Sequence, residues 1–186
     1  MEHRVQPAPR SSQLRTQRCL LRPSGPSDAV WIASAVGDAR YPADDPWSVV
    51  DSVEDARDRL EVQSKCWGER TAFHFTIELL GAPPHAGQVS LSREPEPNTW
   101  LLGYWLVPDV WGSGIATECA TATVHLAFTE LGAHSLWAGV TPHNHRSLRV
   151  LSKLGFEYRN SNPAGYTVDG KPIPNDEYEL VRERAA

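Results

Sequence analysis

The amino-acid sequence predicts an α+β fold in a single domain. Three observations lead to this class: two helical patterns follow a first short strand, an alternating meander occupies the middle of the chain, and two strand–helix units come after it. With 186 residues the chain has an ordinary length for one domain and can bury a substantial core. We expect residues 1–12 to form a disordered tail and residues 13–186 to form the domain.

The elements in the first half of the chain follow from capping residues and alternation. Ser27 or Asp28 is placed to cap a helix, and Ser52-Val-Glu-Asp55 has the form of a capping box with Asp in the fourth place. The pair Pro83-Pro84 interrupts an alternating pattern and indicates a hairpin loop. The expected elements are a strand over residues 17–22, helices over 28–38 and 52–67, a strand over 72–80, a loop over 81–87 and a strand over 88–92.

The function depends on the stretch over residues 99–131. An apolar, aromatic run ends at Pro108, a turn with two glycines follows, and the period becomes helical from Ile115. Glycine lets the backbone turn sharply and approach a ligand, and a helix N-terminus attracts phosphate. This strand, turn and helix therefore predict a phosphate site. The remaining expected elements are a strand over 135–140, a helix capped by Asn144, a loop or loose hairpin over 162–176 and a strand over 177–182.

Three types of phosphate-binding loop can be compared with this turn. A P-loop requires a lysine that the turn lacks, and the dinucleotide fingerprint requires a small residue where Thr117 stands. The third pattern, Gln/Arg-x-x-Gly-x-Gly/Ala, is matched at its last two places by Trp111-Gly-Ser-Gly-Ile-Ala116. Three further short motifs match the same family: Leu102-Gly-Tyr-Trp-Leu106, Asn144-His-Arg-Ser147 and Lys153-Leu-Gly-Phe156. Together they strongly resemble the RimJ/RimL-like branch of the GNAT N-acetyltransferases, over nearly the whole chain.

The resemblance implies the GNAT fold, a twisted, mixed and mostly antiparallel sheet with helices on both faces. It also implies acetyl-CoA as co-substrate, bound in a cleft between the strands over residues 99–107 and 135–140. We expect no metal, because the pair His143 and His145 has no third ligand nearby. The pyrophosphate would bind to backbone N–H groups of the turn, and the pantetheine arm to the end of the first of these strands. The implied binding residues are Trp105, Leu106, Val107, Trp111, Gly112, Ser113, Gly114, Ile115, Ala116, Asn144 and Ser147.

The same resemblance implies two catalytic groups. A backbone N–H at Leu106 or Val107 would polarise the thioester carbonyl, since Pro108 has no N–H. The hydroxyl of Ser147 would lie near the thioester sulfur and protonate the leaving thiolate. Tyr104, on the same strand, either lines the acceptor cleft or belongs to the core.

A general base is missing from the positions at which relatives carry one. The resemblance places these positions at Leu101 and Gly165. The remaining candidates, none supported by spacing, are His74, Glu78, Asp44 and Asp45. An α-amino group, with a pKa of ~8, is about a tenth neutral near pH 7, whereas a lysine amine, with a pKa of ~10.4, is neutral only in a few parts per ten thousand. An enzyme without a strong base should therefore favour an α-amine.

Composition and charge narrow the set of partners. The net charge is −5 with scattered Lys and Arg, which indicates neither a nucleic-acid nor an anionic membrane surface. The chain shows no signal peptide or membrane-helix pattern, and its three widely spaced cysteines suggest buried thiols in a reducing cytoplasm. We expect a cytoplasmic N-acetyltransferase acting on an α-amine of a protein N-terminus or an amino-acid-like compound, and from the family a homodimer. The alternatives are a small-molecule acetyltransferase for an antibiotic or polyamine, and a non-catalytic acyl-CoA-binding module.

Overall fold

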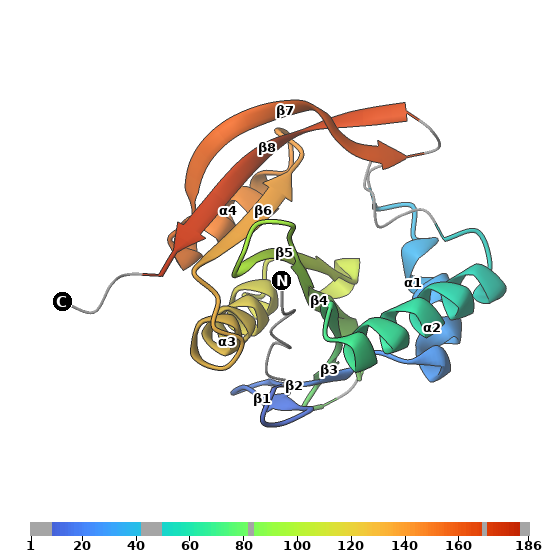
Figure 1. Cartoon of the computed structure of the whole chain (residues 1–186). Coiled ribbons are helices and arrows are strands. Elements are labelled where there is room, and N and C mark those ends of the chain that lie inside the picture. Colours follow the sequence, from blue (N-terminus) through green and yellow to red (C-terminus); the bar gives the residue numbers. More distant parts are fainter. Residues whose placement is uncertain (1–8, 42–49, 82–83, 169–170, 183–186) are drawn as a thin grey trace.

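The structure, a computed structural model, describes residues 9–41, 50–81, 84–168 and 171–182. Within these residues eight strands form one mixed sheet in the order β1-β2-β3-β4-β5-β6-β8-β7 (Figure 1). The elements are β1 (Leu14–Arg15), β2 (Cys19–Pro23), α1 (Ala29–Val36), α2 (Val53–Glu69), β3 (Ala72–Leu79), β4 (His85–Arg93), β5 (Thr99–Leu106), α3 (Ile115–Thr129), β6 (Ser135–Val140), α4 (His145–Leu154), β7 (Glu157–Val168) and β8 (Lys171–Val181), with 3-10 turns at Pro26–Asp28 and Pro108–Val110. The predicted α+β class is confirmed.

The helices α2 and α4 begin where their capping residues predict, whereas Asp28, at the start of α1, makes no side-chain capping bond. Ser52 Oγ accepts a hydrogen bond from the Asp55 N–H at 3.0 Å at the start of α2. Asn144 Oδ1 accepts from the Ser147 N–H at 3.1 Å at the start of α4. Each cap satisfies a backbone donor that has no partner inside its helix. The helix α4 ends at Gly155, whose left-handed backbone (φ 84°) is the usual glycine stop.

The C-terminal segment agrees with the prediction in part. Residues 162–168 and 171–176 belong to β7 and β8, which form an antiparallel hairpin, so the hairpin alternative is confirmed and the loop alternative is wrong. The beginning of β7 at Glu157 was not predicted. The strand β8 also pairs with every residue of β6, from Ser135↔Val181 to Val140↔Asp176. Asn, Pro and Gly obscure the alternation here, and two register shifts in β7 accommodate them. Tertiary pairing therefore forms this hairpin in spite of weak local propensity.

Two further predictions concern the disordered tail over residues 1–12 and the burial of the three cysteines. Residues 1–8 of the expected tail lie outside the described residues, and the N–H of Arg10 donates to Glu130 at 2.6 Å. Cys19 and Cys119 are buried free thiols, as expected, and Cys119 lies in the core. The expectation is wrong for Cys66, which is only half-buried on α2.

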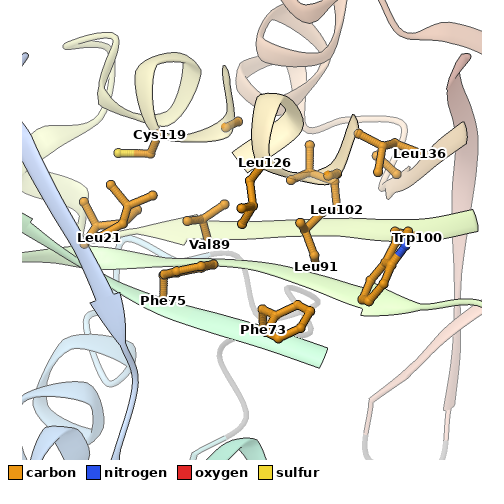
Figure 2. Close-up of a cluster of buried hydrophobic side chains, with 14 of the residues drawn as sticks. Leu21, Phe73, Phe75, Val89, Leu91, Trp100, Leu102, Cys119, Leu126 and Leu136 are labelled. Atoms are coloured by element: carbon orange, nitrogen blue, oxygen red, sulfur yellow. The ribbon is translucent and has the colours of Figure 1, made fainter. Parts of the chain in front are cut away.

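The side chains of β5 alternate between two apolar layers. Trp100, Leu102 and Leu106 join the larger core, which Figure 2 shows between the strands and Leu126 of α3. Trp105 points to the other face and packs in a smaller cluster with α1 and α2. Helices therefore cover both faces of the sheet, as predicted, and β5 is held from both sides.

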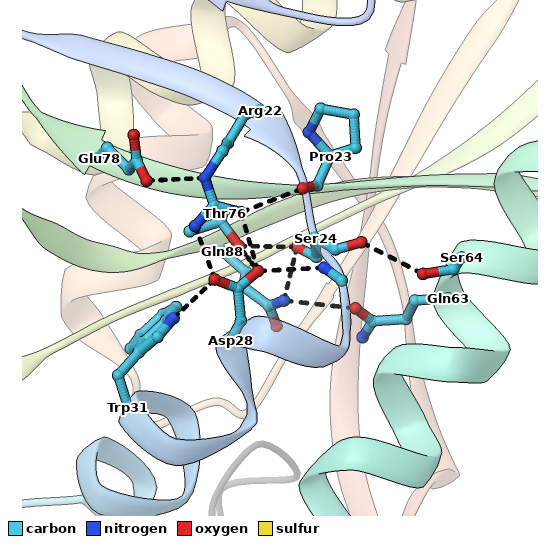
Figure 3. A network of polar contacts seen from close by, with 11 residues as sticks. Arg22, Pro23, Ser24, Asp28, Trp31, Gln63, Ser64, Thr76, Glu78 and Gln88 are labelled. Carbon is cyan, nitrogen blue, oxygen red and sulfur yellow. Dashed lines mark hydrogen bonds and ion pairs between the residues drawn. The ribbon is translucent and has the colours of Figure 1, made fainter.

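A buried ionic network joins the start of α1 to the sheet, with Asp28 at its centre (Figure 3). The Asp28 side chain is 2% exposed and accepts hydrogen bonds from Arg22 at 2.6 Å, Thr76 at 2.9 Å, and Trp31 and the Gly25 N–H at 3.0 Å. Burial alone would raise the pKa of this carboxyl, but the hydrogen bonds, that of Arg22 first, outweigh burial and lower the pKa to about 2.

The same network reaches the functional strand. The hydroxyls of Ser24 and Thr76 lie 3.0 Å apart, and Gln88 Nε2 donates to Ser24 Oγ at 2.8 Å (Figure 3). The other side of the Gln88 amide accepts from Trp105 Nε1 at 3.1 Å. The orientation of the Trp105 ring is therefore coupled to Asp28 through three hydrogen-bonded residues, Gln88, Ser24 and Thr76.

We predict that Asp28→Asn destabilises the domain by about 3 kcal/mol, because it leaves Arg22 without its buried partner. The carboxylate also contributes about 2 kcal/mol of stability above pH ~4 that is lost as the pH falls toward 2, since its pKa is lower in the folded than in the unfolded state. Chemical denaturation between pH 7 and pH 2.5 should therefore show a smaller acid loss in the variant. The control Asp38→Asn, at a partly exposed surface ion pair, should change stability far less. Parallel pH curves for wild type and Asp28→Asn would contradict the prediction.

Candidate functional site

The strands β5 and β6 separate soon after they meet. They form three parallel pairs, the last being Leu101↔Trp137, after which β5 continues along β4 and β6 along β8. A cavity of about 850 Å³ opens between them. Side chains from both faces of β5 line it, including Tyr104 and Trp105, so the cavity extends to both sides of the sheet.

Most of the predicted binding residues meet at this cavity. Those that line it are Trp105, Leu106, Trp111, Gly112, Gly114, Ala116, Asn144 and Ser147. Those that do not are Val107, Ser113 and Ile115. The site is therefore assembled from the end of β5, the turn before α3 and the start of α4.

The glycine turn places an array of backbone N–H groups at one end of the cavity. Gly112 (φ 74°) and Gly114 (φ 85°) have left-handed backbones, which glycine adopts without steric cost. Gly114 is the N-cap of α3, and the Glu118 N–H donates to its carbonyl at 3.1 Å. The N–H groups of residues 115–117 consequently have no acceptor within the helix, and they lie at the positive end of its dipole. Such an end attracts phosphate.

Ser113 and Ile115 stabilise the turn instead of lining the cavity. Ser113 Oγ donates to the Val110 carbonyl at 2.5 Å, and the Ser113 carbonyl accepts from Arg18 at 2.9 Å. Arg18 is in turn ion-paired with Glu118 at 2.7 Å. The Ile115 side chain is buried in the core. Any contact of these two residues with a ligand would therefore be made by their backbone.

Trp111 occupies the first place of the loop pattern and joins three parts of the site. Its indole Nε1 donates to the Leu106 carbonyl at 2.7 Å, which ties the turn to the end of β5. The ring of Tyr41 meets it edge-on at 5.5 Å, and the guanidinium carbon of Arg146 lies 4.6 Å from the ring centroid. A cation over an indole face is stabilised by the ring quadrupole. Trp111 thus positions an arginine at the cavity.

The N–H groups of Leu106 and Val107 face opposite sides of β5. The Val107 N–H donates to the Ala86 carbonyl of β4 at 2.9 Å, so it points away from the cavity. Because N–H groups alternate along a strand, that of Leu106 faces β6 and the cavity. The Leu106 carbonyl faces the same way, since it accepts from Tyr41 Oη at 2.8 Å and from Trp111. Of the two predicted donors, Leu106 alone is directed at the cavity.

Ser147 lies on the first turn of α4, and its hydroxyl faces Tyr104. The two hydroxyl oxygens are 2.7 Å apart, and either can be the donor. Tyr104 lines the cavity while its ring packs partly against the core, so both alternatives weighed for it from the sequence hold in part. The sequence analysis missed this pair because β5 and α4 are far apart in the chain.

Of the candidates for a general base, His74 lines the cavity and Glu78 does not. Burial lowers the pKa of His74 to about 4, so this cavity-lining imidazole is neutral at pH 7 and a weak base. Glu78 is ion-paired with Arg22 at 2.7 Å and does not line the cavity. Asp44 and Asp45 lie outside the described residues. At Gly165 a Cβ would lie 2.3 Å from the Ile173 carbonyl, so the fold excludes a side chain there.

A row of basic side chains on α4 also lines the cavity and was missed from the sequence. It consists of Arg146, Arg149 and Lys153. Their spacing of three and four residues places them on one face of the helix. Because the helix itself was predicted, this spacing was a usable signal. Arg146 lies over the Trp111 ring beside the glycine turn, and Arg149 and Lys153 add positive charge to the same cavity.

Comparison with known proteins now decides the family. A family model described as an acetyltransferase (GNAT) domain matches residues 18–157. The chain belongs to the GNAT acetyltransferases. The resemblance inferred from the sequence is therefore confirmed, and the protein is a GNAT N-acetyltransferase.

Individual relatives agree with this assignment. The uncharacterized N-acetyltransferase YoaA of Bacillus subtilis is 23% identical over 172 residues, which cover 92% of this chain and 97% of YoaA. The probable N-acetyltransferase YjcK of the same organism is 36% identical over 107 residues, 56% of this chain and 59% of YjcK.

Solved GNAT structures share the fold. Mycobacterium smegmatis RimJ in complex with CoA-disulfide superposes with a TM-score of 0.79 at 21% identity, covering 95% of this chain and 90% of RimJ. RimL, a ribosomal L7/L12 alpha-N-protein acetyltransferase in complex with coenzyme A, superposes with a TM-score of 0.79 at 18% identity, covering 91% of this chain and 97% of RimL. The GNAT fold predicted from the sequence is therefore confirmed.

Two further properties bear on the partners. The described helices include none that is long and apolar enough to cross a membrane. In the same part of the chain, no group of three or more His, Cys, Asp or Glu residues is placed to hold a metal ion.

Proposed function

We propose that this enzyme transfers the acetyl group of acetyl-CoA to an α-amino group, at a protein N-terminus or on an amino-acid-like compound. The observation that carries the proposal is the cavity between β5 and β6. Backbone N–H groups at the N-terminus of α3, which suit a phosphate, lie at one end of it, and the described residues that line it include no Asp or Glu. GNAT enzymes use acetyl-CoA, and the RimJ and RimL structures that share this fold hold CoA.

The residues present fit acetyl-CoA. The backbone N–H groups at residues 115–117 and the neighbouring glycines suit the pyrophosphate, and the basic row Arg146, Arg149 and Lys153 adds positive charge beside them. The backbone edge of β5 that faces the cavity offers hydrogen bonds to the pantetheine amides. Asn144 lies at the N-terminus of α4, where its side chain caps the helix.

The chemistry requires little from the protein besides positioning. The neutral amine attacks the thioester carbon, the C–S bond breaks, and the proton released by the amine passes to water. The Leu106 N–H donates to the carbonyl oxygen as negative charge develops on it. The Ser147 hydroxyl donates a proton to the leaving thiolate and is re-protonated from Tyr104 or water, since the two hydroxyls already share a hydrogen bond.

The weak basicity of the cavity determines the class of amine. His74 with a pKa of about 4 cannot deprotonate a lysine ammonium efficiently at pH 7. About a tenth of α-amino groups, with a pKa of ~8, are neutral near pH 7 without a general base. RimL, which shares the fold, is named as an alpha-N-protein acetyltransferase, in agreement with this proposal.

We predict thiol release from acetyl-CoA with a hexapeptide that has a free α-amine and no lysine. A peptide with a blocked α-amine and a free lysine should react at least about a hundredfold more slowly, because its amine is neutral in a far smaller fraction of molecules. Ellman assays on both peptides at pH 7.5 make the comparison. Equal rates would contradict the α-amine assignment. Turnover of an aminoglycoside or polyamine but of no peptide would favour a small-molecule enzyme, and CoA binding without turnover of any amine would favour a non-catalytic module.

We predict that Gly112→Asp weakens CoA binding by at least about tenfold, because it places a carboxylate beside the phosphate-binding N–H groups. Gly112→Asn is the matched control, since Asn has the same shape, no charge and a similar tolerance of the left-handed backbone. Open space surrounds the notional Cβ, so both variants should fold. Calorimetric titration with CoA measures the difference. Equal affinities of the two variants would place the phosphates elsewhere.

We predict that Ser147→Ala lowers kcat about tenfold while it leaves the Kd for CoA within a factor of about two, because the hydroxyl acts on the leaving thiolate. Tyr104→Phe keeps the ring and removes the partner hydroxyl, so it should lower kcat less. Single-turnover thiol release and calorimetry measure the two effects. An unchanged kcat in Ser147→Ala would remove Ser147 from the chemistry.

A further inference from the structure

One half of the cavity lies on the face of the sheet that α1 and α2 cover. Side chains alternate along a strand, so Gly103 of β5 belongs to the same face as Trp105, which packs with these helices. The register continues this row across the sheet, because Gly103 pairs with Ser90 of β4, and Ser90 pairs with His74 of β3. All three residues of the row line the cavity. We call Gly103, Ser90 and His74 the polar trough.

The polar trough is open at β5 and covered at β3. Gly103 has no side chain, which leaves a gap along β5 between the side chains of Leu101 and Trp105. At the other end α2 lies over β3, where Trp67 Nε1 donates to the His74 carbonyl at 3.0 Å. A side chain that enters the trough at β5 is therefore directed toward His74.

The two polar side chains of the trough are available to a ligand. Neither the His74 ring nor the Ser90 hydroxyl makes a hydrogen bond with another of the described residues. In that part of the chain, the fully enclosed side-chain atoms without a partner are His85 Nδ1 and Asn175 Oδ1, so the polar atoms of His74 and Ser90 are open to the cavity. A neutral imidazole and a hydroxyl can each donate and accept. The trough therefore suits an uncharged group that also does both.

The acceptor amine has this half of the cavity for its approach. In the proposed reaction the thiolate leaves beside Ser147, on the face that α3 and α4 cover, whereas the trough lies on the face of α1 and α2 (Figure 1). Neighbouring strands are about 4.8 Å apart, so an amine at the cavity edge of β5 is about 5–7 Å from Ser90. The amide of an N-terminal Asn extends about 5 Å from its α-amine, and a hydrogen bond adds about 3 Å. Such a side chain reaches Ser90 and points toward His74.

We infer that the polar trough binds the side chain of the first residue of the acceptor, and that it selects a neutral polar side chain such as Asn over an apolar one of the same shape, such as Leu. The inference rests on the proposed function and deepens it, since it names the class of N-terminus that the enzyme selects. Selection arises because an apolar side chain displaces water from the trough and leaves Ser90 and His74 without hydrogen-bond partners.

The test uses two hexapeptides without lysine that begin Asn-Ala or Leu-Ala and are otherwise identical. Calorimetry in the presence of CoA measures peptide Kd, and thiol release measures kcat/KM. Wild-type enzyme should bind and acetylate the Asn peptide about tenfold better than the Leu peptide. Ser90→Ala and His74→Phe should each lower this ratio, and the double variant should bring it to about one. His125→Phe, the same substitution at an exposed histidine of α3, should keep the ratio.

The outcomes separate this inference from the proposed function. Equal Kd values for the two peptides in wild-type enzyme, or an Asn preference that survives in Ser90→Ala and His74→Phe, would overturn the inference even if turnover is high. Ser90→Ala removes a single hydroxyl, so it decides the matter alone if His74→Phe does not fold. A fall in kcat by the same factor for both peptides, with an unchanged Kd ratio, would also overturn the inference, because the trough would then act on the reaction and not on the side chain. An Asn preference in Kd with no thiol release would support the trough while it contradicts the proposed activity.

Discussion

The separation of β5 from β6 is the constraint on which the rest of the structure depends. The two strands are parallel neighbours for three residue pairs, and then each follows a different antiparallel partner, β4 or β8. Their facing backbone edges are left inside the protein, where unpaired N–H and C=O groups are costly. Tyr41 and Trp111 satisfy one of these groups, the Leu106 carbonyl. The Leu106 N–H lies on the same edge and faces the cavity.

The surroundings of the cleft hold its two walls in place. At Gly87 of β4 the backbone approaches β5 so closely that a Cβ would lie 2.0 Å from the Trp105 carbonyl. This approach brings Ala86 to the Val107 N–H and thereby directs the Leu106 N–H to the opposite side. On the other face, the Asp28 network reaches Trp105 by way of Gln88. Apolar packing stabilises the sheet, whereas these polar and steric contacts determine the direction of the Leu106 N–H and the orientation of the Trp105 ring at the end of β5.

The charged side chains that line the cleft are mainly basic. Arg146, Arg149 and Lys153 of α4 line it, and the described residues around it include no Asp or Glu. The cleft also contains a neutral histidine, His74, whose pKa is lowered by burial. This arrangement agrees with an enzyme that binds an anionic acyl donor and lets the acceptor amine lose its proton unaided.

Local sequence signals predicted the parts of the structure that depend on neighbouring residues. Ser52, Asn144 and Gly155 mark helix ends, and Gly112 and Gly114 mark the turn, because caps and left-handed backbones act over a few residues. The full length of the β7–β8 hairpin was not predictable in this way, since pairing with β6 stabilises a segment of poor strand propensity. The hydroxyls of Tyr104 and Ser147 belong to two elements, β5 and α4, that are distant in the chain. Only tertiary structure brings them together.

The most direct test of the account is a crystal structure of the protein with CoA. The account predicts the pyrophosphate at the N–H groups of residues 115–117, and the pantetheine between β5 and β6 with the sulfur near Ser147 and the Leu106 N–H. CoA bound outside this cleft, or β5 and β6 paired along their whole length, would contradict it.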